Sequence, residues 1–102
     1  MAGINFEAKA LILKDVPKDK RFVCSNGDSY SSLKDLVEGL KRMKDEVFFY
    51  HVTEDKNDFS TWIYDVVGDV RLANNLRSVN DKKRMIKKIK GRIAYLKKSE
   101  VV

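Results

Sequence analysis

The last quarter of the chain carries the pattern that most limits its fold, a narrow apolar stripe at helical spacing. Its members recur at steps of three and four residues, which places them on one face of an α-helix. They are Met85, Ile86, Ile89, Ile93 and Leu96. A helix with one apolar face must bury that face against another element, so this segment requires a folded body beside it. We expect the helix to open at Asn80-Asp81 and to end at about Lys98.

The preceding part of the chain repeats the same spacing in shorter pieces. Apolar residues at three- and four-residue steps predict helices over residues 33–43, 46–52, 59–67 and 70–79. A residue whose side-chain oxygen can cap the first turn precedes each of them. These predicted caps are Ser32, Asp45, Asp58 and Asp69. Gly68 is placed to end the third helix in the left-handed conformation that glycine adopts readily.

The amino-terminal third is less regular. Residues 4–16 predict a short helix that ends before Pro17, because the residue preceding a proline is disfavoured in the helical region. Residues 21–30 predict a β-hairpin in which Asn26-Gly27 supplies two positive-φ positions. A chain of 102 residues forms one domain. The predicted fold class is therefore mainly α: a compact single-domain bundle of about five short helices with a small β-hairpin near residues 21–30, over residues 1–102.

Charge divides the chain into unlike parts. Residues 1–80 hold 12 Lys and Arg against 13 Asp and Glu, whereas residues 81–102 hold 9 against 2, so almost all of the formal charge of +6 belongs to the terminal helix. Residues 45–69, the acidic middle, hold seven acids and one lysine. Sequence alone leaves open whether these two regions neutralise each other within one molecule.

Composition also limits the setting. The single cysteine, Cys24, excludes an internal disulfide and a cysteine-based metal site. No apolar run has the length of a membrane span, and no secretory leader pattern is present at the amino terminus. We therefore expect a cytoplasmic protein that does not bind membranes and that uses no cofactor.

A set of motifs in the middle of the chain resembles a known family. The motifs are Tyr50-His51-Val52, Asp58-Phe59-x-x-Trp62-Ile63, Val66-x-Gly68-Asp69 and Leu72-Ala73. Their order resembles a small, mainly archaeal domain family of unknown function, over a family-like body of about residues 6–79. The resemblance implies a compact, helix-rich, intracellular domain and transfers no catalytic residue. It leaves the basic terminal helix, about residues 81–98, as the most individual part of the sequence.

His51, the only histidine, has carboxylates near it in the sequence. It could therefore bind a metal ion or take part in acid–base chemistry. The spacing fits neither a zinc site nor a calcium loop. We expect His51 to bond instead to a carboxylate or to backbone at a helix end, where it fixes the turn into the helix that follows Asp58. We predict no metal site.

Other candidate groups have simple structural interpretations. Asp58 and Asp69 could form an acid–base pair, but both directly precede helices and are better explained as caps. Trp62 shares the apolar face of its helix and is expected in the core. Cys24 has no positioned base beside it. Because no set of nucleophile, base and oxyanion donors can be named, we predict no catalytic residue and a protein that is not an enzyme.

The basic face of the terminal helix is the remaining candidate site. Like charges one helical turn apart repel, so a polyanion that neutralises them would explain their presence. Lysine, which outnumbers arginine here, favours contact with phosphates over reading of bases. We predict non-specific binding of a DNA or RNA phosphate backbone through Lys83, Arg84, Lys87, Lys88, Lys90, Arg92, Lys97 and Lys98, with Tyr95 as a stacking group. The alternatives are a protein-interaction module that pairs acidic and basic surfaces, by self-association or with an acidic protein, and an uncharacterised domain whose basic face is only solvated.

Overall fold

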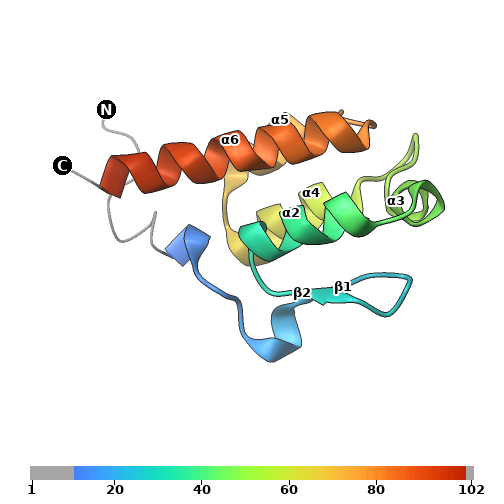
Figure 1. Cartoon of the computed structure of the whole chain (residues 1–102), viewed down its shortest axis with the longest axis horizontal. Coiled ribbons are helices and arrows are strands. Elements are labelled where there is room, and N and C mark those ends of the chain that lie inside the picture. The colour runs from blue at the N-terminus through green and yellow to red at the C-terminus, as the bar shows by residue number, and fades with distance from the viewer. Residues whose placement is uncertain (1–10, 101–102) are drawn as a thin grey trace.

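The computed structural model describes residues 11–100, most of which are helical (Figure 1). In chain order the elements are the 3₁₀ turn η1 (Lys18–Lys20), the strands β1 (Phe22–Val23) and β2 (Ser29–Tyr30), and the helices α2 (Leu33–Arg42), α3 (Asp45–His51), α4 (Asp58–Trp62), η2 (Ile63–Val67), α5 (Val70–Leu76) and α6 (Lys82–Glu100). The predicted fold class, mainly helical with a small antiparallel hairpin, is confirmed.

Helix α6 runs along one side of the molecule and packs against both α2 and α5 (Figure 1). α4 packs against α5, and β2 packs against α2. The apolar stripe of α6 faces the core as predicted: Met85, Ile89 and Leu96 are fully buried, and Ile86 and Ile93 are partly buried against them. Leu36 and Leu40 of α2 belong to the same core. α6 is thus fixed along one face, and its other faces are turned outward.

Three of the predicted helix signals are confirmed. The Ser32 hydroxyl accepts a hydrogen bond from the Asp35 N–H (3.1 Å), and the Asp35 carboxylate in turn accepts one from the Ser31 N–H (2.9 Å). The Asp69 carboxylate caps α5 through the Leu72 N–H (3.2 Å). Gly68 ends η2 with a φ of 85°. Each signal depends only on neighbours in the sequence, which is why local pattern predicts it.

Two predicted caps are wrong. Asn57, not Asp58, caps α4 by accepting from the Ser60 N–H (3.0 Å), and its amide also donates to the Leu76 carbonyl (2.9 Å). Asp58 is therefore the first residue inside the helix. At α3 the residue at the cap position is Lys44, and its side chain makes no capping bond. Both predictions place the cap one residue too late in the chain. The tertiary contacts of the side chain decide which of two adjacent residues lies at the boundary.

The segment predicted as one α-helix over 59–67 changes its winding halfway. α4 continues into η2, a turn of π-helix that closes with the Gly68 N–H donating to the Ile63 carbonyl (2.8 Å). The helix predicted over 70–79 is shorter, because α5 ends at Leu76. Of the helix predicted over 4–16, residues 11–13 are helical, residues 14–16 are not, and the remainder lies outside the described residues.

The hairpin forms as predicted but with a different turn. Of the residues in this turn, only Gly27 has a positive φ (94°), so Asn26 does not adopt the positive φ that was predicted for it. Instead the Gly27 N–H donates to the Cys24 carbonyl (3.0 Å), and the Asn26 side chain accepts from the Asp28 N–H (2.9 Å). This is a three-residue turn with glycine in the left-handed position, the second common way to close a hairpin.

A glycine allows the hairpin to lie on α2. The ring of Tyr30, which is 1% exposed, lies directly over Gly39, where a Cβ atom would overlap the ring. Burial, with Cys24 beside the hydroxyl, raises the pKa of Tyr30 to about 12. Gly39 thus serves close packing at this position.

Candidate nucleic-acid interface

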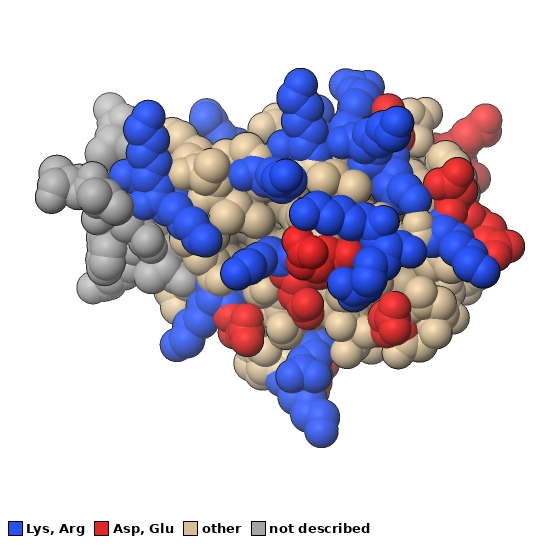
Figure 2. Space-filling model, viewed as in Figure 1, with Lys and Arg blue, Asp and Glu red and all other residues tan. Residues whose placement is uncertain are grey.

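The charged face of α6 follows from the burial of its apolar stripe. Because that stripe faces α2 and α5, most of the lysines and arginines on the other faces of α6 point outward. Figure 2 shows Lys and Arg side chains crowded along the edge of the molecule that α6 forms, with acidic side chains below it and toward α3. Most of the predicted interface is therefore accessible to a large partner.

Arg92 departs from the predicted site. Its side chain is only 10% exposed, and its guanidinium donates two hydrogen bonds to the Asp69 carboxylate (Nε to Oδ2, 2.7 Å; Nη2 to Oδ1, 2.9 Å). Arg92 lies three residues after Ile89 and four before Leu96, so it borders the buried stripe, and this spacing was the available signal in the sequence. Arg92 is a structural ion-pair partner and is not an exposed phosphate contact.

A second cation of the same helix is also held internally. The Lys82 ammonium lies 3.1 Å from the Asp45 carboxylate and donates to the Met43 carbonyl, so it fastens the start of α6 to the junction of α2 and α3. Asp45 and Asp69 both belong to the acidic middle of the chain. The acidic middle and the basic helix therefore neutralise each other at these two cations.

The other seven cations of α6 are exposed, and none forms an ion pair with any residue that the structure describes. They are Lys83, Arg84, Lys87, Lys88, Lys90, Lys97 and Lys98. Helical spacing divides them into two flanks. The outer flank consists of Lys83, Lys87, Lys90 and Lys97, whereas Arg84 and Lys88 lie on the flank next to α5 and Lys98 lies between the two.

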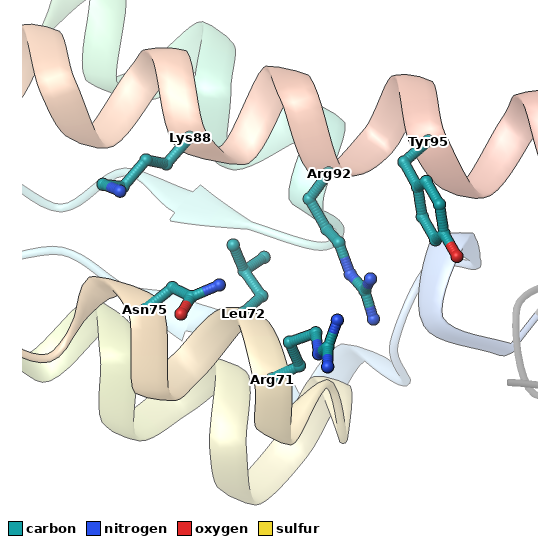
Figure 3. Close-up of a pocket in the computed structure, with 6 residues that line it drawn as sticks. All are labelled: Arg71, Leu72, Asn75, Lys88, Arg92 and Tyr95. Carbon is teal, nitrogen blue, oxygen red and sulfur yellow. The ribbon is translucent and has the colours of Figure 1, made fainter. Parts of the chain in front are cut away.

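The flank next to α5 borders a groove of about 320 Å³, the α5–α6 groove (Figure 3). From α6, Arg92 reaches toward α5, Lys88 extends along the groove away from Arg92, and Tyr95 lies on the other side of Arg92; from α5, Arg71 and Asn75 line the opposite wall. The Tyr95 ring is 54% exposed, and the Arg92 guanidinium lies 5.5 Å from its centroid. The buried ion pair therefore also helps to position the predicted stacking group.

Two residues of this groove, Arg71 and Asn75, were not predicted as site residues. Both are exposed and lie one turn apart on α5. Their spacing indicates a shared helix face, but sequence could not show that this face borders α6. Other surface hollows differ in charge: one is lined by Asp15, Asp35 and Glu38 with a single lysine, and another by Glu54 and Asp55 with Lys56 and Arg77.

His51 has the structural role that was predicted for it. Its Nδ1 lies 2.9 Å from the Asp58 carboxylate, and its Nε2 accepts a hydrogen bond from the Ser25 N–H (3.0 Å). An acceptor Nε2 places the ring proton on Nδ1, so His51 donates to Asp58 as a neutral imidazole. Within residues 11–100 no three His, Cys, Asp or Glu side chains are grouped to hold a metal ion.

The Asp58 carboxylate has a second partner, the Lys56 ammonium at 2.9 Å. Burial acts to raise the pKa of Asp58, but the bonds from His51 and Lys56 outweigh it and hold this pKa below its ordinary value of 3.8. Asp58 and Asp69 lie in separate networks, one with His51 and one with Arg92, which agrees with structural roles for both.

Trp62 is buried, as predicted for a core residue, and Cys24, which was expected to be a strand residue, is buried as well. The Trp62 indole N–H donates to the Lys20 carbonyl (2.8 Å), so its polar atom is satisfied within the fold. Cys24 lies one residue beyond β1. Burial makes Trp62 unavailable for stacking and leaves Tyr95 as the exposed aromatic ring of the predicted site.

Comparison with known proteins identifies a family. Residues 17–98 match a family of unknown function, DUF5752. The matched range includes α6 almost to its end, so it extends beyond the family-like body of residues 6–79. No curated protein and no solved structure matches this chain. Among residues 11–100, no helix combines the length and the apolar composition that crossing a membrane requires.

Proposed function

We propose that this chain, which belongs to the DUF5752 family of unknown function, binds the phosphate backbone of a nucleic acid along the exposed side of α6. The observation that supports this proposal is the set of seven exposed cations on one helix that form no ion pair with the side chains described, those of residues 11–98. Phosphates spaced along a strand are the ligand that a row of cations of this kind can neutralise at several points at once.

The internal ion pairs strengthen the argument. Asp45 and Asp69 form ion pairs with α6, and each is paired with a single cation of that helix. Lys83 and Lys87 remain one turn apart with like charge, as do Arg84 and Lys88, which costs a few tenths of a kcal/mol for each pair. A bound polyanion removes this repulsion.

Lysine-rich contact predicts weak sequence specificity and strong dependence on salt. If about four of the seven cations contact phosphates together, the logarithm of the affinity falls with the logarithm of salt concentration at a slope of about −3 to −4. A fourfold rise in salt then weakens binding about 50- to 150-fold. Fluorescence anisotropy with labelled 20-mers of DNA and RNA measures this slope directly.

Two triple variants with the same change of net charge distinguish binding by this surface from attraction by the overall charge of the protein. Reversal of Lys83, Lys87 and Lys90 to glutamate removes cations of the outer flank, and we expect it to lower affinity at least tenfold. Reversal of three exposed lysines on η1 and α2 changes the net charge equally and serves as the control. These control positions are Lys18, Lys20 and Lys34. Circular dichroism confirms that each variant is folded.

Two results would overturn the proposal. Equal losses of affinity in the two triple variants would assign binding to overall charge, and a flat salt dependence would exclude phosphate contact. Light scattering of the purified chain at two salt concentrations tests the self-association alternative. A salt-sensitive dimer that binds no nucleic acid would assign α6 to contact between copies of this chain.

A further inference from the structure

We infer that the α5–α6 groove receives one unpaired nucleotide of a single strand, with Arg71 against its phosphate and Tyr95 stacked on its base, while Lys88 adds positive charge at the other end of the groove. This inference rests on the proposed function, because it specifies which form of nucleic acid α6 binds. It adds to the site two residues from α5, Arg71 and Asn75, that a reading of α6 alone does not include.

The charge of the groove suits a phosphate. Among the residues that the structure describes, its lining contains three cations, Arg71, Lys88 and Arg92, and no acid (Figure 3). The nearby Asp69 carboxylate is already neutralised by Arg92. The side chains of Arg71 and Lys88 form no ion pair or hydrogen bond with residues in the described part of the chain, so both are available to an anion. Arginine in particular can hold two phosphate oxygens at once.

The size of the groove suits a single nucleotide. A volume of about 320 Å³ lies at the lower end of the range for small-molecule pockets, about 300–1,000 Å³. A stacked and paired base has its faces covered, so a duplex cannot stack a base on an exposed ring. An unpaired base, by contrast, exposes a π-face and an edge that can enter between two helices.

Tyr95 and Asn75 supply the contacts that a base requires. The Tyr95 ring is half exposed at the groove, and Arg92, itself fixed by the buried Asp69, lies against it. A ring held in this way loses little conformational freedom when a base stacks on it. The Asn75 amide offers both a donor and an acceptor to a base edge. The groove thus combines a phosphate contact, a stacking surface and an edge contact.

The experiment compares a labelled 12-nucleotide single strand with its duplex, as DNA and as RNA, by fluorescence anisotropy. We expect the wild-type chain to prefer the single strand, and Tyr95→Ala to weaken single-strand binding about 5- to 150-fold, as loss of one stacked base implies. Duplex binding should change less than twofold. Tyr95→Phe keeps the ring and should stay within twofold of wild type on both ligands.

Tyr64→Ala is the matched control, because Tyr64 is also a partly exposed tyrosine beside an arginine, Arg77, but lies on η2. Melting by circular dichroism confirms that all variants are folded. If neither ligand binds, the proposed function fails. If both bind with a steep salt slope but Tyr95→Ala and Arg71→Ala leave the single-strand preference unchanged, the proposed function stands and this inference is wrong. Equal losses in Tyr95→Ala and Tyr64→Ala would also refute it.

Discussion

The ion pair between Asp69 and Arg92 predicts that Arg92 contributes more to the stability of the fold than the exposed cations of α6 do. The Asp69 side chain is 1% exposed and Arg92 is 10% exposed, and two hydrogen bonds of 2.7 and 2.9 Å join them. Arg92→Ala would leave the carboxylate buried with its cap bond to the Leu72 N–H but without a counter-charge. We therefore expect Arg92→Ala to destabilise the fold, although the same substitution at an exposed lysine should not.

The size of the effect follows from burial. Removal of one partner from a buried ion pair costs about 3–5 kcal/mol, because the remaining charge is neither solvated nor paired. Asp69 keeps one backbone donor, so we expect the lower end of this range, about 3 kcal/mol. For a domain of about 100 residues, 1 kcal/mol shifts the melting temperature by about 4–8 °C, which gives a loss of roughly 12–24 °C.

Urea unfolding followed by circular dichroism measures the difference. Lys90→Ala is the control, because this lysine is exposed on the same helix and its loss should change the free energy of unfolding by at most about 0.5 kcal/mol. Arg92→Lys keeps the charge but loses the second hydrogen-bond donor of the guanidinium. Its free energy of unfolding should therefore lie between those of wild type and Arg92→Ala. If the free energies of unfolding of Arg92→Ala and Lys90→Ala agree within 0.5 kcal/mol, the buried Asp69 carboxylate does not need Arg92 as its counter-charge and the reasoning above is wrong.

Three other predictions concern packing, helix propensity and pH. Gly39→Ala should destabilise by about 1–3 kcal/mol in urea unfolding, since its methyl group would overlap the Tyr30 ring, and an unchanged midpoint would contradict this packing. Gly91→Ala should stabilise the fold by up to about 1 kcal/mol in the same assay, because its Cβ meets nothing within 4 Å; a destabilised variant would contradict the open environment. Because the pKa of Asp58 is lowered in the folded state, its contribution is present above pH 3.8 and is lost as pH falls through the folded pKa. The gap in unfolding free energy between wild type and Asp58→Asn should therefore narrow below about pH 4, and a gap independent of pH would exclude the carboxylate's role.

Sequence predicted those features that depend on neighbouring residues. The stripe of α6, the Ser32 cap and the Gly68 terminator each follow from spacing within one or two turns, and all three are observed. The cap of α4 was misplaced by one residue, because Asn57 and Asp58 are both good caps and their distant contacts decide between them. Asn57 reaches the end of α5, whereas Asp58 reaches His51.

The candidate site was predictable in part for the same reason. The exposure of cations such as Lys87 and Lys90 follows from the helical period, and the structure agrees. The internal pairing of Arg92 depends on an aspartate 23 residues away, and the groove depends on which face of α5 meets α6. Periodicity along one helix contains no information about its neighbour, so Arg71 and Asn75 could not have been assigned from sequence.

The pairing of the two charged regions determines what α6 can do. If the acidic middle covered the basic helix, most of the cations of α6 would form ion pairs within the molecule. Instead Asp45 and Asp69 each hold one cation, and both pairs lie where α6 meets the body. These acids fasten the helix, and because Arg92 also lies against Tyr95, one of them helps to orient an exposed ring at the α5–α6 groove. The same contacts that stabilise the docking of α6 therefore leave its outward charge intact and place an aromatic group beside it, the combination that single-strand binding requires.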